Sequence, residues 1–102
     1  MDVLQTIKRL VLRGNVLFTL KAEDEMARDD LDEDLVCEAI INAPGIAKRL
    51  RSANPQTGRR EYLYIIAGVT FDGTVVYTKG KILKVENREV FYVLISSKKS
   101  TI

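Results

Sequence analysis

"TVVYTKGKILKVENREVFYVLISSKKS", residues 74–100, is the stretch that decides the fold. It holds two runs rich in β-branched and aromatic residues, 74–85 and 89–97, separated by three polar residues. This composition is typical of strands. Because a connection this short joins antiparallel neighbours, the stretch predicts two adjacent antiparallel strands.

Two further runs of the same kind precede this stretch. They are "GIAKRLRS", residues 45–52, and "REYLYIIAG", residues 60–68. A polar connection separates them, and the next connection, "TFDGT", carries an Asp-Gly pair that is a hairpin signal. The four runs together predict an antiparallel meander.

The residues before this region have a helical period. Apolar side chains recur at three- and four-residue spacing, and Asp2, Thr19 and Asp32 are the expected N-caps of successive helices. Gly14 is expected to end the first helix in a left-handed conformation, and "NAPG", residues 42–45, ends the last. Residues 16–18 are expected to form a short extended piece.

These patterns predict one α+β domain spanning residues 1–102. Two or three N-terminal helices pack on one face of a four-stranded antiparallel sheet. The charged segment around the second helix, "AEDEMARDD", is interpreted as a solvated face.

Composition limits the chemistry that this chain can perform. Its 102 residues include no histidine and one cysteine, Cys37, which excludes an intrachain disulfide and a histidine–cysteine zinc site. No metal site or cofactor is expected. The sequence has no apolar run of membrane-spanning length and no secretory signal core, so the expected location is the cytoplasm.

The charge is divided unevenly along the chain. Residues 1–47 hold five Lys or Arg and ten Asp or Glu, whereas residues 48–102 hold eleven and four. A basic half in a small protein indicates a polyanionic partner, with nucleic acid the foremost candidate. Mutual neutralisation of the two halves within the fold is the plainer alternative.

Period-two alternation places part of this charge on a sheet face. Tyr77, Lys79 and Lys81 share one face of their strand, while Lys98 shares a face with Tyr92 and Lys99 points away. A basic sheet face with an aromatic ring suits single-stranded RNA, because cations hold phosphates and rings stack on bases. A lysine-rich face that serves only solubility fits the same pattern.

The chain resembles the MqsR family of toxin–antitoxin ribonucleases, which belong to the RelE-like group. The segments that carry the resemblance follow one another in the family's order. They are "TIKRLVLRGNVLFTLKAEDE", "LDEDLVCEAIINA", "AKRLRS", "VYTKGKI" and "VLISSKKS". The resemblance implies a RelE-like fold and cleavage of messenger RNA, either free or at the ribosome. It also implies silencing by a cognate antitoxin that carries a zinc-binding domain, a helix-turn-helix domain or both.

The resemblance also assigns site residues. The catalytic positions of the family correspond to Lys48, Tyr77 and Lys98. Glu61, which falls where the family has a glutamine, is the fourth catalytic candidate and a candidate general base if it faces the site. The cations expected to contact RNA are Arg49, Arg51, Arg59, Arg60, Lys79 and Lys81.

A mechanism without histidine or metal is available because RNA supplies its own nucleophile, the 2′-hydroxyl. Cations near the phosphate would stabilise the charge that gathers during attack. Three interpretations remain open at this point: a toxin-like endoribonuclease, a non-catalytic RNA- or ribosome-binding module of the same fold, and a protein-interaction domain that docks an acidic partner.

Overall fold

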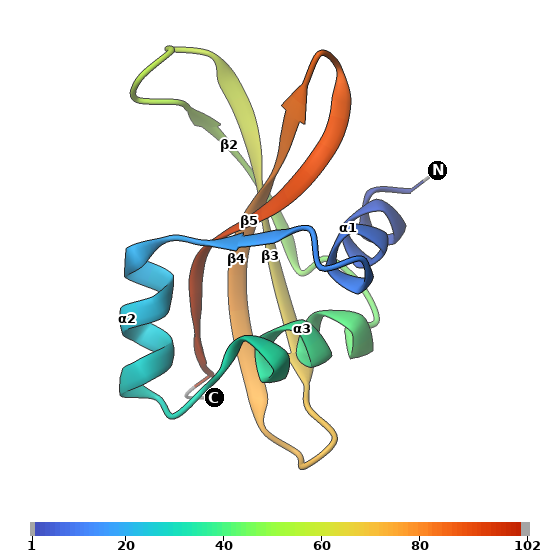
Figure 1. Cartoon of the computed structure of the whole chain (residues 1–102), viewed down its shortest axis with the longest axis vertical. Helices are drawn as coiled ribbons and strands as arrows, with labels where there is room; N and C mark the ends of the chain where they lie inside the picture. The colour runs from blue at the N-terminus through green and yellow to red at the C-terminus, as the bar shows by residue number, and fades with distance from the viewer. Residues whose placement is uncertain (1, 101–102) are drawn as a thin grey trace.

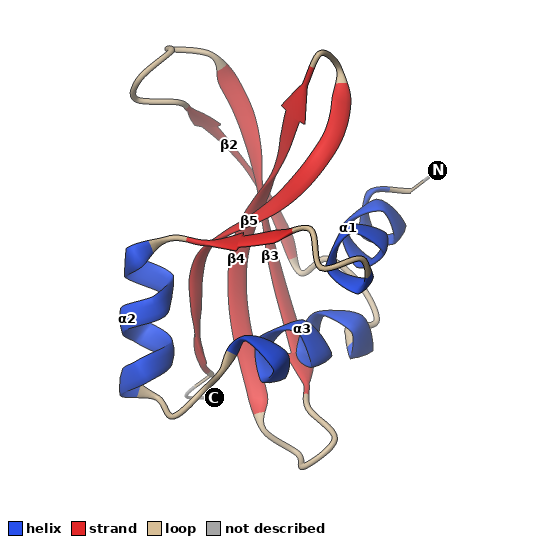
Figure 2. Cartoon of the chain, in the orientation of Figure 1, coloured by secondary structure: helices blue, strands red, loops and turns tan. Residues whose placement is uncertain are grey.

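A computed structural model describes residues 2–100, which form three helices and a five-stranded mixed sheet (Figure 1 and Figure 2). The sheet order is β1-β5-β4-β3-β2. In chain order the elements are α1 (Val3–Leu12), β1 (Val16–Phe18), α2 (Leu20–Arg28), α3 (Glu33–Asn42), β2 (Lys48–Ala53), β3 (Arg60–Val69), β4 (Val75–Val85) and β5 (Arg88–Lys99). None of these helices is long and apolar enough to cross a membrane.

The α+β class is confirmed, but the prediction of four antiparallel strands was wrong. β2 to β5 form the expected antiparallel meander, and β1 adds a fifth strand that runs parallel to β5, with Val16 opposite Tyr92. The sequence of only three extended residues does not indicate which strand they pair with. Here the pairing joins segments more than 70 residues apart in the chain.

The local signals for helix ends are confirmed. The side chains of Asp2, Thr19 and Asp32 each accept a hydrogen bond from a backbone N–H in the first turn of α1, α2 and α3, respectively. Gly14 has a φ of 76°, the left-handed conformation that favours glycine. These short-range interactions satisfy backbone groups that a helix end leaves unpaired.

The core lies between the sheet and helices α1 and α3. It contains Ile7 and Leu10 of α1, Val36 and Ile40 of α3, and a row of strand residues beneath them. The strand residues are Tyr64, Ile66, Val76, Tyr92 and Leu94. The second helix lies along β5 beside the short strand β1 (Figure 1).

The sheet divides into two prongs at one end. Pairing between β3 and β4 stops at Tyr64 and Gly80, although β2–β3 pairing continues to Arg60 and β4–β5 pairing continues to Arg88. The two hairpin ends therefore diverge, as the upper part of Figure 1 shows. We call this divergence the fork.

Candidate nucleic-acid interface

The sheet face opposite the core is open. Val69 and Val75, which are paired across β3 and β4, keep exposed fractions of 46% and 38%. Directly paired residues share a face, so the ladder also assigns Ala67, Tyr77 and Lys98 to one row of this surface. No helix within residues 2–100 packs across it (Figure 2).

Lys98 lies directly opposite Tyr77 on the open face. Its Nζ is 5.5 Å from the centre of the Tyr77 ring, within the range of a cation–π contact. The prediction that Lys98 shares a face with Tyr92 was wrong, because Tyr92 is fully buried in the core. The assignment of Lys98 itself as a phosphate-contacting residue stays a prediction.

A β-bulge explains the change of face. Lys79 pairs with Ser96 and Gly80 pairs with Leu94, so Ile95 is an extra residue on β5. One extra residue reverses the alternation of every side chain that follows it. Lys98 is thereby turned to the open face, and Lys99 pairs with Val76 of the core row.

Two carboxylates, from Glu25 of α2 and from Asp29 at its C-cap, hold β5 immediately after this bulge. Glu25 accepts hydrogen bonds from the Ser96 hydroxyl at 2.7 Å and from the Ser97 backbone N–H at 3.1 Å. Asp29 accepts one from the Lys99 backbone N–H at 2.9 Å. We call this arrangement the α2 latch. It supplies acceptors for backbone groups along a part of β5 that β1 does not reach.

The surroundings of Glu25 favour the charged form of its carboxyl group. Burial alone raises the pKa of Glu25, but the hydrogen bonds from Ser96 and Ser97, together with Lys21, outweigh it and hold the pKa below its usual value. The charged acceptor strengthens both hydrogen bonds. The interpretation of this acidic segment as a wholly solvated face was therefore wrong for Glu25.

Lys48 and Lys79 extend the open face next to the Tyr77 row. Both lie opposite Ile65, which separates them by two strand spacings, about 10 Å. Lys48 is exposed and Lys79 is partly exposed. The structure therefore brings Tyr77, Lys79 and Lys98 together and adds Lys48 at the far side of the same surface.

Glu61 lies away from this group. It is paired with Ser52, four residues along β3 from Ile65, which corresponds to about 13 Å. Both carboxylate oxygens lie 3.3 Å from the Lys81 ammonium. Glu61 and Lys81 thus form an ion pair at the fork, and the structure does not place Glu61 beside Tyr77.

The predicted RNA-binding arginines lie elsewhere. Arg49 and Arg51 stand on the core side of β2, where their guanidinium carbons lie 4.5 Å and 5.7 Å from the centre of the Tyr62 ring. Arg59 and Arg60 lie at the far end of the β2–β3 hairpin. These four cations therefore form a second basic region, separate from Tyr77 and Lys98.

Comparison of the chain with protein-family models, curated proteins and solved structures finds no match. The resemblance to the MqsR family stays a prediction.

Cys37 carries none of the signs of a reactive thiol. Burial, with smaller contributions from Asp34 and Glu33, raises its pKa to about 11. A thiol that stays protonated near neutral pH is a weak nucleophile and a poor metal ligand. Within residues 2–100, no three histidine, cysteine or acidic side chains gather into a group that could hold a metal ion.

Sequence reasoning missed two features of this surface. The α2 latch was hidden because Glu25 and Asp29 sit in a run of charges, although their spacing of four residues places them on one helix side. The fork left no sequence signal, because all four strand patterns continue past the point where β3 and β4 separate.

Proposed function

We propose that the chain is the toxin of a toxin–antitoxin pair and cleaves messenger RNA as a metal-independent endoribonuclease. The observation that carries the proposal is the Tyr77–Lys98 pair on an open sheet face, with Lys79 adjacent. The ammonium groups of Lys79 and Lys98 can approach one phosphate, and Lys48 can contact a neighbouring one.

In the proposed reaction, the ribose 2′-oxygen attacks the adjacent phosphorus and the bond from phosphorus to the 5′-oxygen breaks. The 2′-proton leaves, the 5′-oxygen gains a proton, and the products carry a 2′,3′-cyclic phosphate and a 5′-hydroxyl. Lys98 and Lys79 stabilise the additional negative charge on the phosphorane. Tyr77 contacts the same phosphate through its hydroxyl, and its ring orients the Lys98 ammonium.

The α2 latch supports this arrangement because it fixes the backbone on both sides of Lys98. The N–H group of Ser97 is held by Glu25 of α2, and that of Lys99 is held by Asp29 at the C-cap of the same helix. Lys98 is therefore presented from an anchored strand end. Anchored positions of this kind lower the cost of bringing a cation to a transition state.

The partner in this proposal is an antitoxin that covers the open face. Its contact surface would be acidic and partly apolar, because the face combines lysines with Ile65, Val69 and Val75. Coverage of Lys98 would exclude RNA while the pair is intact.

A non-catalytic RNA-binding module is the second candidate. The Glu61–Lys81 ion pair favours it, because the one carboxylate among the proposed site residues is held at the fork rather than beside Tyr77. A binding module needs cations and a ring but no proton acceptor at the phosphate.

A cleavage assay with matched variants tests the proposal. Purified protein is incubated with a messenger RNA fragment in the presence of EDTA, and the product ends are identified. We expect cyclic phosphate ends, with activity lost in Lys98→Ala and reduced in Tyr77→Phe. Lys99→Ala is the control, because it removes the same charge from the next residue, which pairs in the core row.

Three results count against endonuclease activity at this site. Cleavage that disappears in EDTA contradicts the metal-independent mechanism. Equal losses in Lys98→Ala and Lys99→Ala contradict the assigned site. RNA binding without any cleavage supports the second candidate instead.

A further inference from the structure

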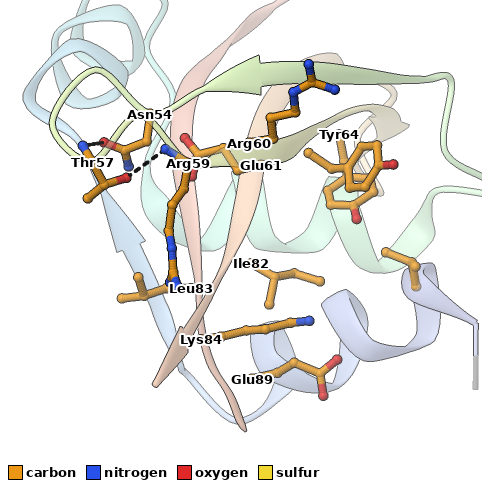
Figure 3. Close-up of a pocket in the computed structure, with 12 residues that line it drawn as sticks. Asn54, Thr57, Arg59, Arg60, Glu61, Tyr64, Ile82, Leu83, Lys84 and Glu89 are labelled. Atoms are coloured by element: carbon orange, nitrogen blue, oxygen red, sulfur yellow. Dashed lines mark hydrogen bonds between the residues drawn. The ribbon is translucent and has the colours of Figure 1, made fainter. Parts of the chain in front are cut away.

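The fork encloses a cleft that the proposed reaction does not use. A cavity of about 480 Å³ lies where the two hairpins separate (Figure 3), and Val3 of α1 is also among its lining residues. This volume falls within the range of pockets that bind small organic molecules. We call this cavity the fork cleft.

Aromatic and aliphatic side chains supply the apolar part of the cleft wall. Tyr62 and Tyr64 line it from β3, and Ile82 and Leu83 line it from β4. Tyr62 keeps an exposed fraction of 39%, although the Arg49 guanidinium carbon lies 4.5 Å from the centre of its ring. The exposed part of the ring is available to a planar ligand.

Cations enter the cleft wall from both prongs. Arg59 and Arg60 come from the β2–β3 hairpin and Lys84 comes from the β4–β5 hairpin (Figure 3). None of these three forms a salt bridge with a residue in 2–100. In Figure 3 the Arg59 side chain extends from the turn toward Leu83.

Two carboxylates also line the cleft, but they do not cancel its positive charge. Glu61 is neutralised by Lys81 at the base of the fork. Glu89 is the other acidic lining residue and lies directly opposite Lys84 across β4 and β5, so it offsets part of that charge. The charge of the two lining arginines on the other hairpin remains. The cleft therefore favours an anionic ligand.

We propose that the fork cleft binds one nucleoside phosphate, either free or as one residue of an RNA strand. The base lies against the Tyr62 ring and the apolar wall, and the phosphate lies between Arg59 and Lys84. Aromatic stacking together with charge is the combination that proteins use to bind single nucleotides without a sequence code.

The cleft begins where the Tyr77 row of the open face ends. Tyr77 lies three residues along β4 from Gly80, about 10 Å, but on the face opposite Tyr62 and Tyr64, which line the cleft from the core side. The binding proposal does not depend on cleavage, since its contacts involve none of Tyr77, Lys79 and Lys98.

The experiment compares two double variants that remove equal charge. Arg59→Gln/Lys84→Gln changes both prongs of the cleft, whereas Arg13→Gln/Arg28→Gln changes two exposed cations on other elements. Uridine monophosphate and a short single-stranded RNA are titrated into each protein. Backbone amide shifts of residues 59–62 and 82–84 report the cleft directly by NMR.

For the wild type and the control pair, we expect uridine monophosphate to shift these amides. For the cleft pair, the double variant Arg59→Gln/Lys84→Gln, we expect at least a tenfold loss of nucleotide affinity relative to the wild type. The slope of log K for the RNA against log salt should decrease in magnitude by about 0.7, because the contact with one phosphate is lost. Tyr62→Leu, which keeps an apolar side chain, should weaken nucleotide binding by about tenfold.

The outcomes separate the two ligand sources and the two proposals. If uridine monophosphate binds in the cleft, a free nucleotide is a sufficient ligand. If only the single-stranded RNA binds there, the ligand is a nucleotide within an RNA strand. Equal behaviour of the cleft and control pairs overturns the inference, whatever the cleavage result. If the wild type cleaves no RNA but the cleft pair still loses nucleotide affinity, the proposed ribonuclease fails and the fork cleft stands.

Discussion

Glu25 on α2 and Ser96 on β5 lie 71 residues apart in the chain and are joined by a hydrogen bond of 2.7 Å between Oε1 and Oγ. The same carboxylate oxygen accepts the Ser97 N–H. Both contacts are buried and follow the bulge that turns Lys98 toward Tyr77. The geometry of the candidate site thus depends on an acidic residue that does not belong to the site.

Removal of this carboxylate should destabilise the protein strongly. Glu25→Ala leaves two buried donors without an acceptor, and we expect the free energy of unfolding to fall by about 3 kcal/mol. Glu25→Gln keeps an acceptor oxygen and should cost about 1 kcal/mol. Urea denaturation measures both. Glu23→Ala, an exposed change on the same helix, is the control, and an equal loss in Glu23→Ala contradicts the latch.

The latch should also produce a defined pH dependence. The pKa of Glu25 in the folded state lies below its ordinary value of 4.5, so the unfolded chain binds the proton more readily. This contribution is fully present above pH 4.5 and is lost as the pH falls through the lower folded-state pKa. The stability difference between wild type and Glu25→Gln should therefore shrink in acid.

Urea unfolding of the two proteins at neutral pH and at a series of acidic pH values measures this difference. The pKa of Asp72 is also lowered, chiefly by hydrogen bonds from Thr70 and Thr74. It is present in both proteins, so its effect cancels. A difference that stays constant with pH argues against a charged Glu25 in the folded state.

The parts of the fold that were predictable depend on neighbours in sequence. The caps at Asp2, Thr19 and Asp32 follow from one side chain and the next turn of backbone. The Asp72-Gly73 turn is likewise local, with Gly73 at a φ of 89°. Four strands were recognised because their composition alone distinguishes them from the helices.

The parts that were not predictable depend on distant pairing. Ile95 does not look different from any other strand residue, yet its lack of a partner on β4 decides which face Lys98 occupies. Strict alternation therefore identified Tyr77 correctly as lying opposite the core row but placed Lys98 with Tyr92. Lys48, Tyr77 and Lys98 do share one face, whereas Glu61 is separated from them by its position along β3.

Gly68 should be intolerant of any side chain. A Cβ at this position would lie 1.8 Å from the Ala39 carbonyl oxygen, because α3 packs directly on the β3 backbone. We expect Gly68→Ala to cost at least about 3 kcal/mol, since backbone must move. Gly45→Ala, where a Cβ meets nothing within 4 Å, should stay within about 0.5 kcal/mol. Thermal unfolding compares them, and a tolerated Gly68→Ala is inconsistent with this contact.

The hydroxyl of Tyr92 should be dispensable. Its ring is fully buried against Gly80, and its oxygen has no hydrogen-bond partner among residues 2–100. Tyr92→Phe removes an unsatisfied polar atom and should raise the free energy of unfolding by about 1 kcal/mol. Tyr92→Leu leaves a void and should lower it by about 3 kcal/mol. Destabilisation by Tyr92→Phe in urea denaturation would show that the oxygen is bonded.

Lys79 and Lys81 lie on the same side of β4 but should differ in their effect on RNA. Lys81 is held by Glu61 at 3.3 Å, whereas Lys79 forms no salt bridge within residues 2–100 and lies in the row next to Tyr77. If the open face cleaves RNA, Lys79→Gln should reduce the cleavage rate by about 100-fold, because it removes a cation beside the phosphate.

Lys81→Gln should reduce the same rate by less than about tenfold, because Lys81 already neutralises a carboxylate. Single-turnover cleavage measured for both variants at one salt concentration gives the ratio. A larger loss in Lys81→Gln than in Lys79→Gln would move the reacting phosphate from the Tyr77 row to the fork.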